Sequence, residues 1–170
     1  MASNIEIKAR IRDWAQFKRR AEELSDTPVE VIRQEDVFFH TSQGRLKLRI
    51  LSPASGQLVW YSRPDAIGPK RSDYLICATG EPDAMKNLLA WALQVRGVVR
   101  KTRYLYPIGQ TRLHMDEVEG LGTFAELEVV LRPGQSDADG LAVADALMRK
   151  LEICEEDLIE GAYMDLLERR

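Results

Sequence analysis

Cysteine, histidine and long apolar runs are all scarce in this chain. Its 170 residues include two cysteines, Cys77 and Cys154, and two histidines, too few for a Cys/His cluster of the kind that holds zinc. Both cysteines have apolar neighbours, which predicts buried, reduced thiols rather than a disulfide or a reactive nucleophile. No stretch approaches the roughly 20 apolar residues that a membrane span needs. We therefore expect a soluble protein with no membrane partner.

The chain also lacks an excess of basic charge. It has 24 Lys and Arg against 27 Asp and Glu, for a net charge of -3, so no overall positive field attracts nucleic acid. Near the N-terminus, Glu6 and Lys8 stand where a secretory signal has its apolar core, which predicts a cytoplasmic protein. The length fits one domain over residues 1–170. Monomer and homodimer remain open.

The periodicity of apolar residues predicts a mixed fold. Segments at about 14–24, 82–95 and 137–151 repeat apolar residues with a period of 3.6, which indicates amphipathic helices, the first with Asp13 as its N-cap. A short helix is expected at about 161–168. It either plugs one mouth of the folded sheet or simply docks against it. Eight segments alternate with a period of two and predict strands, joined by turns short enough for antiparallel pairing. These strands are expected at about 3–11, 29–40, 44–51, 57–64, 71–79, 98–107, 110–117 and 124–132.

The alternation puts charged side chains on one face of several strands, because residues i and i+2 share a face. An open sheet with one solvated face explains such a pattern, and so does a closed barrel with a charged lumen. The helices must cover the apolar rows, and a sheet of eight strands tends to close. Like charges on one strand also repel unless an anion lies among them. We therefore predict an α+β fold, a closed eight-stranded antiparallel β-barrel with helices packed on the outside. Its charged rows are Glu6, Lys8 and Arg10; Arg45, Lys47 and Arg49; Tyr61 and Arg63; Lys101 and Arg103; Arg112, His114 and Asp116; and Glu126 and Glu128.

The charges in these rows indicate a ligand. Converging Arg and Lys groups suit a compact polyanion, since Arg offers a planar fork and Lys a point charge. Carboxylates beside them would repel that anion unless a hard cation lies between, and oxygen ligands are those that Mg²⁺ or Mn²⁺ prefers. A small-molecule polyphosphate would bind the basic groups, and its metal ion would bind the carboxylates. His114 either contacts phosphate or is a hydrogen-bonded structural histidine.

Several motifs occur in order along the whole chain. They are Asn4-Ile5-Glu6-Ile7-Lys8, Gln34-Glu35-Asp36-Val37-Phe38-Phe39, Gly44-Arg45-Leu46-Lys47-Leu48-Arg49, Tyr61-Ser62-Arg63, Lys70-Arg71-Ser72, Arg112-Leu113-His114-Met115-Asp116 and Glu126-Leu127-Glu128. With them the chain resembles the CYTH superfamily, which groups class IV adenylyl cyclases with thiamine triphosphatases and inorganic triphosphatases.

The resemblance implies a triphosphate tunnel with Mg²⁺ or Mn²⁺ as cofactor and site residues that carry over by motif. One departure is Asn4, a neutral residue where the family motif begins with Glu, which predicts a more weakly held metal. The implied triphosphate binders are Lys8, Lys47, Arg49, Arg63, Arg71, Arg103 and Arg112. The implied metal ligands are Glu6, Asp116, Glu126 and Glu128, and the implied catalytic residues are Glu6, Lys8, Glu126 and Glu128.

Three functions remain open at this point. The first is metal-dependent hydrolysis of tripolyphosphate or of an organic triphosphate such as thiamine triphosphate or a nucleotide, favoured because no aromatic pocket for a base is evident. The second is a class IV adenylyl cyclase, which converts ATP to cyclic AMP and pyrophosphate. The third is a module that binds polyphosphate or nucleotide without turning it over, for which Asn4 is the direct support.

Overall fold

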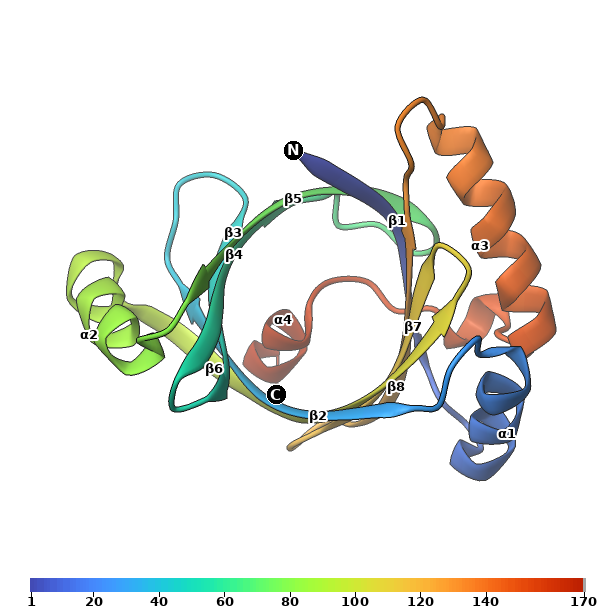
Figure 1. The fold of residues 1–170 in the computed structure, drawn as a ribbon, viewed down its shortest axis with the longest axis horizontal. Helices are drawn as coiled ribbons and strands as arrows, with labels where there is room; N and C mark the ends of the chain where they lie inside the picture. Colours follow the sequence, from blue (N-terminus) through green and yellow to red (C-terminus); the bar gives the residue numbers. More distant parts are fainter. Residues whose placement is uncertain (170) are drawn as a thin grey trace.

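Eight antiparallel strands close into a barrel, which Figure 1 shows end-on. The structure is a computed structural model that describes residues 1–169. Around the barrel the strand order is β1-β5-β4-β3-β2-β6-β7-β8. The predicted closed eight-stranded barrel is confirmed. Its strands are β1 (Ala2–Arg10), β2 (Glu30–Phe39), β3 (Arg45–Ser52), β4 (Ser55–Ser62), β5 (Lys70–Thr79), β6 (Val95–Ile108), β7 (Thr111–Val118) and β8 (Gly122–Val130).

The N-terminal strand closes the barrel, because β1 pairs with β8 on one side and with β5 on the other. Hairpins join β2 to β3, β3 to β4, β6 to β7 and β7 to β8, as the short connections predicted. In the turn before β3, Gly44 has a φ of 64°, and a Cβ there would lie 2.7 Å from the carbonyl oxygen of Tyr61. Both the positive φ and the close approach therefore require glycine.

Three helices cover the outer, apolar face of the barrel (Figure 1). The first, α1 (Trp14–Leu24), begins at Asp13, whose side chain accepts a hydrogen bond from the Gln16 amide. On the same side, α3 (Asp137–Leu151) packs on β1 and β8 and joins the largest apolar core. On the opposite side, α2 (Pro82–Leu93) packs through Leu89 on β2, β3 and β4. Because the helices bury the outward rows, the inward rows are left to line the lumen.

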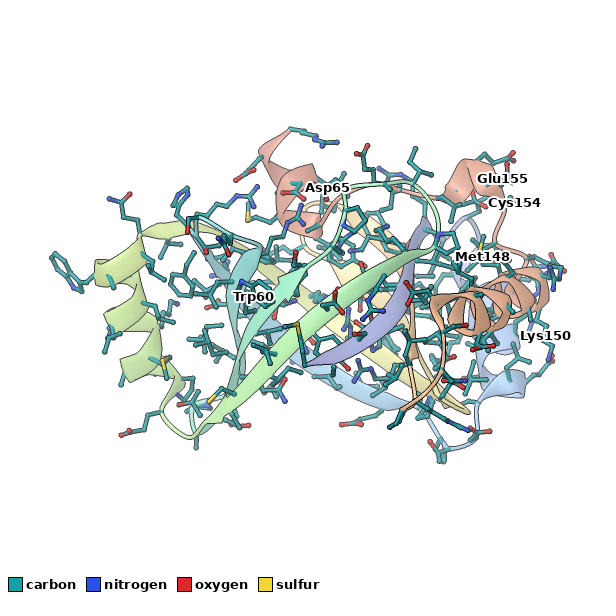
Figure 2. All side chains as sticks on the ribbon, turned by 90° about the horizontal axis from the view of Figure 1, so that it is seen from above. Trp60, Asp65, Met148, Lys150, Cys154 and Glu155 are labelled. Atoms are coloured by element: carbon teal, nitrogen blue, oxygen red, sulfur yellow. The ribbon has the colours of Figure 1, made fainter. Side chains whose placement is uncertain are left out.

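The last helix, α4 (Tyr163–Glu168), follows the short 3₁₀ turn η1 (Glu155–Asp157) and lies across one end of the barrel (Figure 1). Tyr163 and Met164 pack in a cluster with Phe38, Val99, Val118 and Phe124, from the inward rows of β2, β6, β7 and β8. A Cβ on Gly97 would lie 2.5 Å from the sulfur of Met164, so glycine is needed for this approach. Seen from the side in Figure 2, α4 sits at the same end as Asp65. The C-terminal segment is thus a plug, one of the two roles expected for it.

The expectation of buried thiols was wrong, since Cys77 and Cys154 are both exposed. Cys77 lies on β5 and faces outward, because the inward row of this strand is Lys70, Ser72, Tyr74 and Ile76. The strands on which α2 packs are β2, β3 and β4. Cys154 lies just before η1, at the surface beside Glu155 (Figure 2). Within residues 1–169, no helix is long and apolar enough to cross a membrane.

Candidate active site in the barrel lumen

The inward rows enclose a cavity of about 390 Å³, a size usual for a small-molecule site. Seven basic and five acidic side chains line it, although the chain as a whole has a net charge of -3. Positive charge is therefore in excess inside the barrel, which suits an anion. The basic residues are Lys8, Lys47, Arg49, Arg63, Lys101, Arg103 and Arg112, and the acidic ones are Glu6, Glu30, Asp36, Glu126 and Glu128.

Each of these basic groups lies within ion-pair distance of a carboxylate, usually on a neighbouring strand. Lys8 on β1 faces Glu126 on β8, with 3.6 Å between Nζ and Oε1. The Nε of Arg63, just after β4, lies 2.9 Å from Oε1 of Glu6. Burial raises the pKa of Glu6 even though Arg63 opposes the shift. The lumen thus holds its basic groups in ion pairs with carboxylates.

Asp36 on β2 is a central member of this network that sequence analysis did not assign to the site. It accepts hydrogen bonds from Lys47 at 2.8 Å and from Arg49 at 3.2 Å. Burial alone would raise the pKa of Asp36, but Lys47 and Arg49 outweigh it and hold the pKa far below its usual value. Burial lowers the pKa of Lys47 in spite of Asp36. The signal available in the sequence was the alternation of Gln34, Asp36 and Phe38 on one face of the strand.

Asp116 on β7 is fully buried and serves the site from behind. Its two oxygens accept hydrogen bonds from Nε and Nη2 of Arg103, each at 2.7 Å, from Lys101 at 3.2 Å and from the Tyr163 hydroxyl at 2.9 Å. Burial and the neighbouring Arg103 lower the pKa of Lys101 to about 8. Asp116 is absent from the residues that line the cavity. Its contacts orient Arg103 and anchor α4. Metal ligation by Asp116 stays a prediction.

Glu126 and Glu128 on β8 lie beside His114 on β7. One ligand atom from each falls within 4.8 Å of the other two. Arg103 donates to Glu126 at 2.8 Å and Arg112 to Glu128 at 2.9 Å. Burial and the positive charge of Arg103 lower the pKa of His114 to about 3, so its imidazole is neutral at pH 7. Two carboxylates and a neutral imidazole are a donor set that fits a divalent metal ion.

Arg71 does not lie in the cavity, contrary to the expectation that it binds triphosphate. On β5 it is paired in register with Ile5, whose side chain belongs to the outer core, and it forms ion pairs with Asp73 and Asp137 on the outside. The inward residue is its neighbour Lys70, which lies opposite Glu6. Burial and nearby Arg63 lower the pKa of Lys70 to about 8. The motif lies on a strand as predicted, but of its two adjacent basic residues the prediction placed the wrong one on the inward face.

Asn4, the departure from the family motif, is buried in the lining of the cavity. Its side-chain oxygen has no hydrogen-bond partner among residues 1–169. It lies opposite Ser72 on β5 and Val130 on β8. The remaining implied binders and ligands, Lys8, Lys47, Arg49, Arg63, Arg103, Arg112, Glu6, Glu126 and Glu128, all line the one cavity.

Towards the end of the cavity opposite α4 the lining includes a group of apolar and aromatic side chains, which sequence analysis missed. In β2, Ile32 lies six residues from Phe38, or about 20 Å at about 3.3 Å per residue. Leu105 is likewise six residues from Val99 in β6, and both Phe38 and Val99 contact α4. The apolar and aromatic side chains near this end are Ile32, Leu51, Ile76, Leu105 and Tyr74, which we call the collar. Two charged residues, Glu30 opposite Leu105 and Arg112 opposite Pro107, line the same end.

Comparison with known proteins agrees with this geometry. A model of the CYTH domain matches residues 2–163. A protein of Methanocaldococcus jannaschii, whose name provisionally assigns it to the adenylate cyclases, is 23% identical over 95% of this chain and 97% of its own length. The PH1012 protein of Pyrococcus horikoshii has the same fold, with a TM-score of 0.84, 24% identity and coverage of 96% of this chain and 98% of that one. A Hippeastrum protein, described as an adenylyl cyclase candidate with a dominant triphosphatase activity, has a TM-score of 0.60 and 18% identity, with 88% of each chain covered.

Proposed function

The chain belongs to the CYTH domain family, and we propose that it hydrolyses the terminal phosphoryl group of a triphosphate in its barrel with the help of a divalent metal ion. The observation that carries the proposal is the excess of buried basic groups beside the carboxylates of Glu126 and Glu128. The Hippeastrum protein with a dominant triphosphatase activity supports the same reaction class. Mg²⁺ and Mn²⁺ are both suited to the oxygen ligands present.

The basic residues of the lumen would bind and orient the phosphates. When a triphosphate enters, Lys47 and Arg49 can exchange Asp36 for phosphate oxygens, and Arg112 can exchange Glu128. These cations are already in position, so they can stabilise the charge that develops on the leaving group without reorganising. Glu126 and Glu128, with Glu6 opposite Glu128 on β1, would hold the metal ion. A bound divalent ion supplies positive charge against phosphate oxygens and lowers the pKa of water.

Orthophosphate release from tripolyphosphate tests the proposal directly. With Mg²⁺ or Mn²⁺ we expect steady release, and we expect Glu128→Gln to lower kcat by about 10²-fold or more, as for loss of one preorganised electrostatic group. Glu117→Gln is the matched control, because Glu117 is exposed on the same hairpin. Equal rates in the wild type and Glu128→Gln would contradict the assignment. Tight binding without product over several metals would favour a module that only binds.

The collar supports a second candidate, a class IV adenylyl cyclase. A group of apolar side chains with one tyrosine suits the flat base of a nucleotide, because aromatic faces stack on one another. Arg112, which lies 5.9 Å from the centre of the Tyr74 ring, would then sit where base and phosphates meet. The name of the Methanocaldococcus jannaschii relative points the same way.

Product identity separates the two candidates. A cyclase converts ATP to cyclic AMP and pyrophosphate, whereas a hydrolase releases orthophosphate, and phosphorus NMR distinguishes them. If the collar holds an organic group, Tyr74→Ala raises KM for an organic triphosphate and leaves KM for tripolyphosphate unchanged. Equal changes for both substrates would exclude that role for Tyr74.

A further inference from the structure

His114 has an unpaired ring nitrogen that faces the two carboxylates of β8. Its Nδ1 lies 4.0 Å from Oε2 of Glu126 and 4.0 Å from Oε1 of Glu128. Both distances are too long for hydrogen bonds. The β7–β8 register puts His114 directly opposite Glu126, so all three groups project from adjacent strands into the same part of the lumen. The geometry leaves a gap between one nitrogen and two oxygens.

The isolation of this nitrogen needs an explanation. The His114 side chain is 5% exposed, and Nδ1 has no hydrogen-bond partner within residues 1–169. The great majority of buried polar atoms have a hydrogen-bond partner, because an unpaired one costs about 1–3 kcal/mol. A structural histidine would be expected to satisfy Nδ1 with a carbonyl or a carboxylate, whereas a ligand nitrogen is left open towards its metal.

We propose that Nδ1 of His114 is a nitrogen ligand of the divalent ion held by Glu126 and Glu128, an inference that rests on the metal dependence of the proposed function. A set of one imidazole and two carboxylates differs from the all-oxygen sets that Mg²⁺ prefers. An imidazole ligand strengthens the binding of transition metals, and the affinity is lower for Mn²⁺ than for Co²⁺. The site therefore selects Mn²⁺ or Co²⁺ over Mg²⁺.

The neighbouring cations leave room for this ligation. The ion pairs of Arg103 with Glu126 and of Arg112 with Glu128 both use Oε2. Oε1 of Glu128, which faces His114, is not the oxygen that Arg112 uses. At Glu126 the oxygen that faces His114 is Oε2, so the metal ion would share this atom with Arg103, while Oε1 is 3.6 Å from Lys8. An ionised carboxylate has about four lone-pair positions. A metal ion can thus share both carboxylates with their arginines.

Electron spin-echo spectroscopy of bound Mn²⁺, without any substrate, tests the ligation. We expect nuclear modulation from a directly coordinated ¹⁴N in the wild type, replaced by ¹⁵N modulation when the protein is labelled with ¹⁵N-histidine. The chain has two histidines, and His40→Ala is the matched control because His40 is exposed at the end of β2. His40→Ala should keep the ¹⁴N signal. Labelled wild type keeps the test valid even if a variant at His114 fails to fold.

Affinity gives the second measurement. Calorimetry should show that His114→Asn weakens Mn²⁺ binding about 10- to 100-fold, the range seen when groups supporting a metal ligand are removed, and weakens Mg²⁺ binding less. Bound Mn²⁺ without nitrogen modulation would overturn the inference while leaving hydrolysis standing. Nitrogen modulation without phosphate release under any metal would uphold the ligand and reject hydrolysis. No binding of Mn²⁺, either alone or together with tripolyphosphate, would reject both.

Discussion

Asp36→Asn isolates the central electrostatic feature of the lumen, the pairing of cations with carboxylates in the absence of ligand. The substitution keeps the shape of the side chain and removes the charge between Lys47 and Arg49. Both cations then lack their anion, while the cavity still holds them in place. We expect the free protein to lose stability and the affinity for tripolyphosphate to rise, because the phosphates no longer compete with Asp36.

The loss of stability follows from the burial of the three groups. Removing one partner of a buried pair costs about 3–5 kcal/mol. Lys47 and Arg49 are 13% and 20% exposed, so water in the cavity hydrates them partly, and we expect the lower end, about 3 kcal/mol. For a chain of this size, about 2–4 °C of Tm per kcal/mol gives a decrease of about 6–12 °C. The Kd for tripolyphosphate should fall by about tenfold, equivalent to ~1.4 kcal/mol.

Thermal unfolding with and without tripolyphosphate, in the presence of a chelator, measures both effects. Asp73→Asn is the matched control, since Asp73 forms an exposed ion pair with Arg71 on the outside, which contributes about 1 kcal/mol or less. The ligand should raise the Tm of Asp36→Asn by more than it raises that of the wild type or the control. An unchanged Tm, or the same ligand shift in all three proteins, would refute the reasoning.

Three further predictions use other parts of the molecule. The pKa of Lys101, which lines the cavity, is lowered to about 8 by burial and by Arg103, so its cation is lost as pH rises from 7 to 9. Over that range wild-type affinity for tripolyphosphate should fall in calorimetry, and Lys101→Met should bind more weakly at pH 7 with a shallower dependence. Gly140→Ala would favour a helix elsewhere, but here the new Cβ lies 2.6 Å from Ile5 Cγ1, so we expect a loss of about 1–3 kcal/mol in urea unfolding. Tyr163→Phe removes a 2.9 Å hydrogen bond to a buried carboxylate and should cost about 1.5–3 kcal/mol in the same assay; no change would show that α4 does not depend on it.

The sequence predicted the fold and most of the lumen because both depend on local patterns. Alternation of apolar and charged residues identifies strands and their two faces without knowledge of their neighbours. Eight such segments can cover their apolar faces in few ways. Closure of the sheet into a barrel was therefore the favoured arrangement. Most charged residues of β1, β3, β6 and β8 that were assigned to the lumen line it. The exceptions are Arg10, which is exposed, and Arg45, which pairs with Asp65 and Asp165 at the end of the barrel that α4 covers.

Facts that depend on strand register could not be predicted in the same way. Lys70 and Arg71 are adjacent and both basic, so charge alone does not say which one faces inward. Their orientation follows from pairing with β1, where Lys70 lies opposite Glu6 and Arg71 opposite Ile5. A shift of one residue reverses every side chain of a strand. Register is set by contacts between distant segments, and such contacts have no local signature.

Asp36 was missed for the same physical reason. The repulsion among Arg45, Lys47 and Arg49 was taken to require a bound anion, since strand β3 contains no carboxylate. The structure supplies the anion from β2, where Asp36 lies opposite Arg49. The repulsion argument holds for a single strand and fails for a pair whose register is unknown. The plug formed by α4 is comparable, because a short apolar C-terminal helix fits several docking positions equally well.

The pairing inside the lumen implies that a triphosphate and a metal ion favour each other's binding. A triphosphate that takes Arg112 leaves Glu128 without its cation, and a metal ion that shares Glu128 with Arg112 weakens the attraction between the two side chains. Either ligand alone would leave a buried charge without a full partner, which is costly away from bulk water. When both ligands bind, the triphosphate pairs with Arg112 and the metal ion pairs with Glu128. Each buried charge then again has a partner of opposite sign. Coupling between two ligands is reciprocal, so the barrel discriminates against free triphosphate and free metal by the same free energy. The ion pairs of the lumen are therefore part of its selectivity, and their strength sets the degree to which the two ligands must bind together.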